Sequence, residues 1–174
     1  MEKMIDNLLI KHKYSEPMTF VLQLFLEERP NIILLNGKLK KFGLTMNDLR
    51  VESLQVVMDY VEDILEDDVI TQSEKDNLHM LKKYLQIQEG DFLKYHKEHE
   101  IQEIIYLQMQ NILSDLTVDK NEAMMKTDLQ KLFDLSYDQF LNFERKAIEE
   151  ALKKGANIKD LDTFYKGDLL LWNY

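Results

Sequence analysis

The chain contains no cysteine and little glycine or proline. Its 174 residues include five glycines and two prolines. Without cysteine there is no disulfide framework, no thiolate metal site and no cysteine nucleophile. The scarcity of glycine and proline favours helices over a turn-rich β architecture. These absences predict a helical protein and fit a cytoplasmic location.

An excess of positive charge and long apolar runs are missing as well. The formal net charge is −10 and basic residues are interspersed with acids, so the basic stripe that binds phosphates is absent and nucleic acid is not an expected partner. No apolar run approaches the roughly 20 residues of a membrane span. The first residues also lack the basic and apolar segments of a secretory signal. We expect a soluble protein that stays in the cytoplasm.

Apolar residues recur at spacings of three and four through most of the chain, and no linker rich in glycine, proline or serine divides it. We predict an all-α fold, with residues 1–174 forming a single compact domain of about seven helices. Capping signals such as Ser136-x-x-Gln139 mark helix starts, and Gly43 and Gly155 suit helix ends. The expected helices cover residues 15–29, 31–42, 48–65, 74–85, 90–112, 119–133 and 136–155.

An internal duplication relates residues 56–95 to residues 104–143 at an offset of 48. The same order of aspartate, branched aliphatic residue and glutamate recurs in register. Aromatic residues follow the duplication at helical spacing, which is typical of a core. These expected core aromatics are Tyr84, Phe92, Tyr95, Phe133, Tyr137, Phe140 and Phe143.

Each copy carries an acidic loop ahead of a helix, and carboxylate oxygens are suitable ligands for a divalent cation. A twelve-residue calcium loop ending at Glu74 matches half of the EF-hand pattern, but Leu65 occupies a ligand position, so a full EF-hand is not supported. Helix capping is the alternative role, because Thr71-x-x-Glu74 and Asp119 with Glu122 fit capping boxes. The candidate metal ligands are Asp63, Asp67, Asp68, Glu74, Asp115, Asp119 and Glu122.

The string from Asp67 to Glu74, followed by a leucine-rich helix, resembles the TerB-like family over about residues 56–150. The hallmark of that family is Asp-Gly-x-Ile-x-x-x-Glu, present in duplicated all-helical halves. The resemblance implies acidic metal sites at Asp67, Glu74, Asp115 and Glu122, and a stress-response or scaffolding role without catalysis. The hallmark glycine is Asp68 in one copy and Leu116 in the other. Leucine is strained in a left-handed conformation, so the second loop is expected to have another shape.

Few other residues suggest chemistry. The segment from His96 to Glu103 places His96 near Glu100 and His99 near Glu103 on a predicted helix, which is either a metal-binding face or a solvated face with ordinary pairs. The chain has no phosphate-binding loop, serine elbow or His-Glu-x-x-His motif, so an enzyme is not expected. The apolar tail, residues 157–174, either docks on the core or meets a partner.

Three hypotheses follow from these patterns. The first is a non-enzymatic, TerB-like stress-response or scaffold module that binds calcium, magnesium, manganese or zinc at its acidic loops. The second is a metal-free helical module, regulatory or phage-related, that binds a protein partner or forms a homo-oligomer. The third is an enzyme that uses the face from His96 to Glu103.

Overall fold

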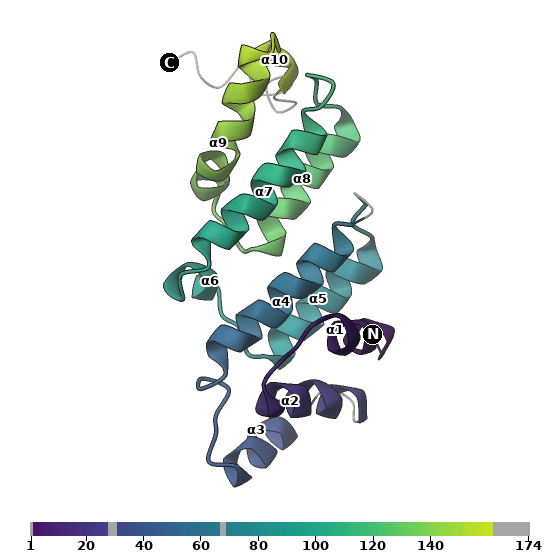
Figure 1. The fold of residues 1–174 in the computed structure, drawn as a ribbon, viewed down its shortest axis with the longest axis vertical. Helices are drawn as coiled ribbons and strands as arrows, with labels where there is room; N and C mark the ends of the chain where they lie inside the picture. Colours follow the sequence, from purple (N-terminus) through teal and green to yellow (C-terminus); the bar gives the residue numbers. More distant parts are fainter. Residues whose placement is uncertain (1, 28–30, 67–68, 162–174) are drawn as a thin grey trace. The chain divides into compact units, whose positions relative to one another are not determined.

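Helices account for all the regular structure in the described part of the chain. The structure is a computed structural model, and it describes residues 2–27, 31–66 and 69–161 (Figure 1). These residues form ten helices and no β-strand, which confirms the all-α prediction. The helices group into two compact units, Met1–Tyr95 and His96–Tyr174. The boundary falls at the end of the first copy of the duplication, and a single domain over residues 1–174 stays a prediction.

The first unit is built around α4, which is buried on most of its surface. Helix α1 packs against both α2 and α4, and α5 packs along α4. The phenol of Tyr84 donates a hydrogen bond to the carbonyl of Val21 at 3.3 Å, and its ring meets that of Phe25 edge to face. The helices of this unit are α1 (Glu2–Lys11), α2 (Glu16–Glu27), α3 (Ile32–Lys41), α4 (Arg50–Ile64), α5 (Gln72–Tyr84) and α6 (Asp91–Lys94).

The second unit pairs α7 with α9 along their lengths, and α8 also packs against α7. The Tyr106 hydroxyl donates to the Glu150 carboxylate at 2.9 Å and so links α7 to α9. That hydrogen bond holds the pKa of Glu150 below its ordinary value. The helices of this unit are α7 (Glu98–Ile112), α8 (Lys120–Leu132), α9 (Tyr137–Lys153) and α10 (Ile158–Leu161).

The two helices at the centre of each copy repeat in register. Helices α4 and α7 are both 15 residues long, α5 and α8 are both 13, and each pair is offset by 48 residues. The turns after α5 and α8 match as well, because Gln86 and Asp134 both have left-handed backbones with φ of 56° and 54°. A shared backbone plan therefore underlies the sequence repeat.

The predicted number of about seven helices is too low. The expected helix over residues 90–112 is two helices, because His96 has a φ of 62° and a helix cannot continue through a left-handed residue. The sequence patterns also did not predict α1 and α10. Within the described residues, no helix is long and apolar enough to cross a membrane. Of the tail, residues 157–174, the described part ends at Leu161, which is buried, and the prediction for residues 162–174 lies outside the described part.

Candidate binding groove

The two glutamates of the acidic loops cap helices. Glu74 accepts hydrogen bonds from the backbone amide and hydroxyl of Thr71 at 2.8 and 2.7 Å. Glu122 accepts from the backbone amide of Asp119 at 2.7 Å. Both are the third residues of capping boxes, which satisfy amides that a helix start leaves unpaired. The capping interpretation is confirmed for both copies.

The described aspartates of the candidate set are engaged locally. Asp119 accepts from the amides of Asn121 and Glu122, and Asp115 accepts from the amide and hydroxyl of Thr117 at 3.0 Å. Asp63 lies on α4 with its carboxylate 2.7 Å from Nζ of Lys11. Hydrogen bonds from the ammonium group to Asp63 and then to Glu66 raise the pKa of Lys11.

The structure does not gather these carboxylates into one cluster. Asp67 and Asp68 lie outside the described residues. Among residues 2–27, 31–66 and 69–161, no group of three or more histidine and acidic side chains is placed to hold a metal ion. Binding of a cation at the acidic loops therefore stays a prediction.

The segment from His96 to Glu103 does not form the continuous face that its spacing predicts. His96 precedes α7, and Lys97 takes the partner expected for it, with Nζ 3.0 Å from the Glu100 carboxylate. His99 and Glu103 lie 3.7 Å apart, but both are largely exposed to solvent. The helical spacing predicted between His96 and Glu100 is wrong, because His96 itself has a left-handed backbone with a φ of 62° and lies before the start of α7.

The second acidic loop does not have the different backbone shape that its leucine predicts. Leu116 occupies the position of the family's hallmark glycine, and its φ is 69°. A leucine there was expected to force a different loop shape, yet the backbone adopts the conformation that glycine favours. Contacts around the loop offset the strain, since the amide of Val118 donates to the carbonyl of Asp160 at 2.8 Å and its side chain is buried.

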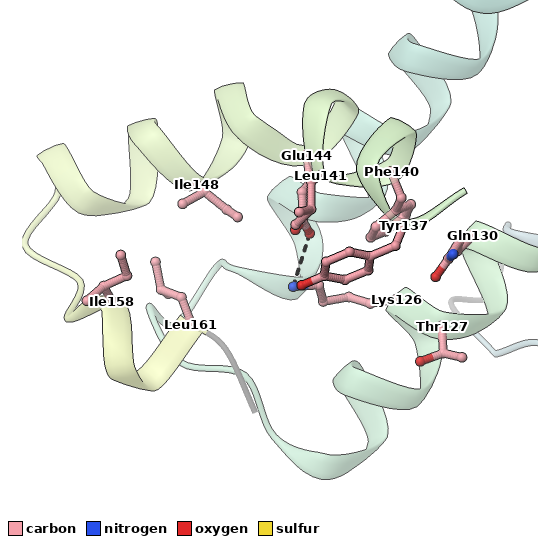
Figure 2. Close-up of a pocket in the computed structure, with 10 residues that line it drawn as sticks. All are labelled: Lys126, Thr127, Gln130, Tyr137, Phe140, Leu141, Glu144, Ile148, Ile158 and Leu161. Carbon is pink, nitrogen blue, oxygen red and sulfur yellow. Dashed lines mark ion pairs between the residues drawn. The ribbon is translucent and has the colours of Figure 1, made fainter. Parts of the chain in front are cut away.

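A groove of about 340 Å³ lies in the second unit among α8, α9 and α10 (Figure 2). This volume is at the low end of the range for pockets that bind small molecules. The lining comes from one stripe of α9, one face of α8 and both apolar residues of α10. The lining residues are Lys126, Thr127, Gln130, Tyr137, Phe140, Leu141, Glu144, Ile148, Ile158 and Leu161.

The rim of the groove exposes apolar side chains. Tyr137 is 55% exposed, Ile158 61% and Leu141 37%, whereas Phe140 and Leu161 deeper in the groove are buried. Tyr137 was expected in the core, and that expectation is wrong because the side of α9 that carries it faces the groove rather than α7. Three apolar side chains therefore stay exposed beside the apolar lining of the groove.

The floor of the groove holds a buried ion pair. Nζ of Lys126 on α8 lies 3.0 Å from the carboxylate of Glu144 on α9, with side chains 10% and 3% exposed (Figure 2). Each charge neutralises the other, so the groove presents no net charge to an occupant. The pair also joins the two helices that form the walls.

Helix α10 closes one end of the groove. Asn157 caps it by accepting from the amide of Lys159 at 3.0 Å, and the bond from Val118 to Asp160 ties it to the second acidic loop. Ile158 and Leu161 then face Ile148 of α9 (Figure 2). The loop that the sequence suggested as a cation site thus helps position the end of the groove.

Sequence reasoning missed this groove, although one signal for it was present. Helix α9 carries apolar residues on two adjacent stripes. Phe143, Ala147 and Ala151 are buried, while Tyr137, Leu141 and Ile148 lie along the groove. An apolar surface wider than one packed face indicates a second contact, but it does not say which element or ligand makes it.

Comparison with known proteins finds no matching family model, no similar curated protein and no similar solved structure. The class of protein is therefore described from its fold and its groove alone. The described chain is an all-helical protein with a duplicated helix pair, and its second unit carries an apolar groove.

Proposed function

We propose that the protein is a non-enzymatic interaction module that binds an apolar polypeptide segment in the groove between α8, α9 and α10. The observation that carries this proposal is the exposed apolar rim formed by Tyr137, Leu141 and Ile158 above a lining of buried apolar side chains. Binding of an apolar segment would remove this surface from water, which is the main favourable contribution in most protein associations. Helical grooves of this type commonly receive one face of a peptide.

The charges in the groove support a polypeptide occupant over an ion or a charged small molecule. Lys126 and Glu144 are already paired at 3.0 Å, and a charged ligand would have to compete with that contact. An apolar segment leaves the pair intact. The net charge of −10 likewise opposes nucleic-acid binding. A cytoplasmic location and a protein partner, either another chain or a second copy, are part of this proposal.

Photo-crosslinking tests the proposal directly. A photoreactive phenylalanine derivative replaces Tyr137 at the rim, and the matched control carries it at Met124, which is 57% exposed on α8 but does not line the groove. The variants are irradiated in cells, and cross-linked peptides are identified by mass spectrometry. We expect polypeptide adducts from position 137 well above those from position 124. Equal yields at both positions would refute groove binding.

One observation favours a second candidate, the TerB-like cation-responsive module. Leu116 has a φ of 69° at the position where that family has its hallmark glycine, so the loop backbone matches what the resemblance implies. A divalent ion bridging loop carboxylates would reduce their repulsion and fix the flanking helices. This candidate would serve the same scaffolding role, with the cation controlling it.

Calorimetric titration with calcium, magnesium, manganese and zinc tests the cation. We expect binding that the double substitution Asp67→Asn with Glu74→Gln abolishes. A matched control, Asp138→Asn with Glu149→Gln, removes the same number of charges on α9, outside both acidic loops, and should leave binding unchanged. Absence of binding at millimolar metal would rule the cation out.

A further inference from the structure

Helix α3 and the turn after it form a basic segment in an acidic protein. Residues 31–47 contain three lysines, Lys38, Lys40 and Lys41, and no aspartate or glutamate. The whole chain carries a net charge of −10, so the rest of it is more acidic than that total. Lys40 and Lys41 are exposed at the end of α3, and within the described residues neither has an ion-pair partner. These two ammonium groups are therefore available to an external group.

Two large apolar side chains lie exposed on the same segment. Ile33 in the first turn of α3 is 85% exposed, and Phe42, directly after its last residue, is 65% exposed. Lysines in the last turn stabilise a helix through its dipole, but this role does not account for exposed isoleucine and phenylalanine near them. An interface that combines apolar contact with opposite charges would use both kinds of side chain.

The exposed face of α3 also has a gap at Gly37. This glycine lies four positions from both Ile33 and Lys41, so the three residues share one face of the helix. A Cβ added at Gly37 would meet no neighbouring group within 4 Å, and glycine inside a helix is less stable than alanine. The fold therefore does not require glycine there, whereas a partner could approach the helix closely at this point.

We infer that the α3 surface, formed by Ile33, Gly37, Lys40, Lys41 and Phe42, binds an acidic amphipathic segment of another polypeptide. Carboxylates of that segment pair with the two lysines, and its apolar side chains cover the isoleucine and the phenylalanine. This inference goes beyond the proposed function, because it concerns a different surface, on the first unit, and a partner of defined charge.

Other occupants fit the α3 surface less well. A helix that lies in a membrane interface needs a free apolar face, but that face of α3 packs in the core, where Leu35 and Leu39 are fully buried. Anionic lipid and nucleic acid would also be repelled by the acidic remainder of the chain. A second copy could supply carboxylates, but contact between unlike faces of two copies is heterologous and leads to rings or open filaments. A separate acidic polypeptide meets none of these objections.

Fluorescence anisotropy with two labelled amphipathic helical peptides tests the charge of the partner. One peptide carries glutamate on its polar face, and the other carries lysine at the same positions. We expect the full chain to bind only the glutamate peptide, with an affinity that falls as salt is added. Lys40→Glu with Lys41→Glu should weaken this binding by on the order of tenfold, because two attractive pairs become repulsive. Equal binding of both peptides would overturn the inference.

Matched substitutions separate the α3 surface from general effects of charge and folding. Lys153→Glu with Lys154→Glu reverses two adjacent exposed lysines at the end of α9 and should weaken binding far less than the change at Lys40 and Lys41. Gly37→Gln should keep the fold, since glutamine is a good helix former, yet it should weaken binding by filling the gap. An affinity that falls equally in both lysine variants, or that Gly37→Gln leaves unchanged, would overturn the inference.

Photo-crosslinking in cells identifies the class of partner. A photoreactive phenylalanine derivative replaces Ile33, and the control carries it at Ile10 on α1, which is 82% exposed. Adducts to acidic segments of another protein, specific to position 33 and lost when Lys40 and Lys41 are reversed, support the inference. Adducts chiefly to lipid or nucleic acid would overturn it, as would cross-links between isotopically light and heavy copies of the purified chain. Binding to phosphatidylglycerol vesicles that the lysine reversal abolishes would likewise assign the surface to lipid and overturn it.

Discussion

The ion pair on the floor of the groove should be costly to break and cheap to replace as a whole. Lys126 and Glu144 lie 3.0 Å apart with side chains 10% and 3% exposed, so removal of one leaves the other charge inside the protein. Breaking a buried pair in this way typically costs about 3–5 kcal/mol, whereas replacing both partners by apolar residues is often neutral. The perturbation is a cycle of Lys126→Met, Glu144→Leu and the double variant.

The two single substitutions should differ in magnitude. Lys126→Met leaves a carboxylate that is almost wholly buried, and we expect it to lower the free energy of unfolding by about 4 kcal/mol. Glu144→Leu leaves an ammonium group on a flexible stem that can reach toward water, so about 3 kcal/mol is expected. The double variant should lie within ~1 kcal/mol of the native protein.

Urea unfolding followed by circular dichroism measures these differences. With a slope of about 2 kcal/mol per molar urea, a loss of 4 kcal/mol moves the midpoint by about 2 M. The matched control is Glu66→Gln, which removes the exposed pair of Lys11 with Glu66 and should change stability by less than ~1 kcal/mol. The reasoning is refuted if Lys126→Met costs no more than this control, or if the double variant is as unstable as the two single losses added together.

Three further predictions test local features of the fold. Gly37 lies inside α3, where an added Cβ would meet no neighbouring group within 4 Å, so Gly37→Ala should stabilise the protein by about 0.5–1 kcal/mol. Gly43→Ala should instead destabilise it by about 1 kcal/mol, because the φ of Gly43 is 71°. Thermal unfolding that shifts in the same direction for both variants would contradict this prediction. Burial raises the pKa of Tyr60 to about 12 from 10.0. The free energy of unfolding should therefore be unchanged below pH 10 and fall as the pH rises from 10 to 12. A fall of the same slope in Tyr60→Phe would show that Tyr60 is not the group responsible. Asp119→Ala should lower the free energy of unfolding more than Thr71→Ala, and a loss of about 1 kcal/mol is typical of a helix cap. The reason is that the Asp119 carboxylate accepts hydrogen bonds from two amides at its helix start, whereas the Thr71 hydroxyl accepts from one. Denaturant midpoints measure the two losses, and the reverse order would disprove the prediction.

Much of the fold could be predicted because the signals for it are local. Capping boxes at Thr71 and Asp119 depend on residues three positions apart, and the predicted starts of α5 and α8 lie within about two residues of the observed ones. The 48-residue repeat predicted matching helices for the same reason. By contrast, the break at His96 has only a weak local signal, because histidine adopts a left-handed backbone more often than most residues but far less readily than glycine.

The candidate site was less predictable than the fold. The loop carboxylates have two uses that look alike in sequence, capping and cation binding, and hydrogen-bond geometry is needed to recognise the first. The groove was not predicted because it forms from residues on three helices. Its end depends on the contact between Val118 and Asp160, which are 42 positions apart.

The sequence alone determined the helical class, the repeat and the capped helix starts, because each follows from periodicity or from contacts within one turn. Tertiary structure alone decided that Tyr137 lies on an exposed rim, that Leu116 adopts a left-handed backbone, and that Lys126 meets Glu144 under the groove. These features depend on which helix faces which, and that is set by packing between residues far apart in the chain.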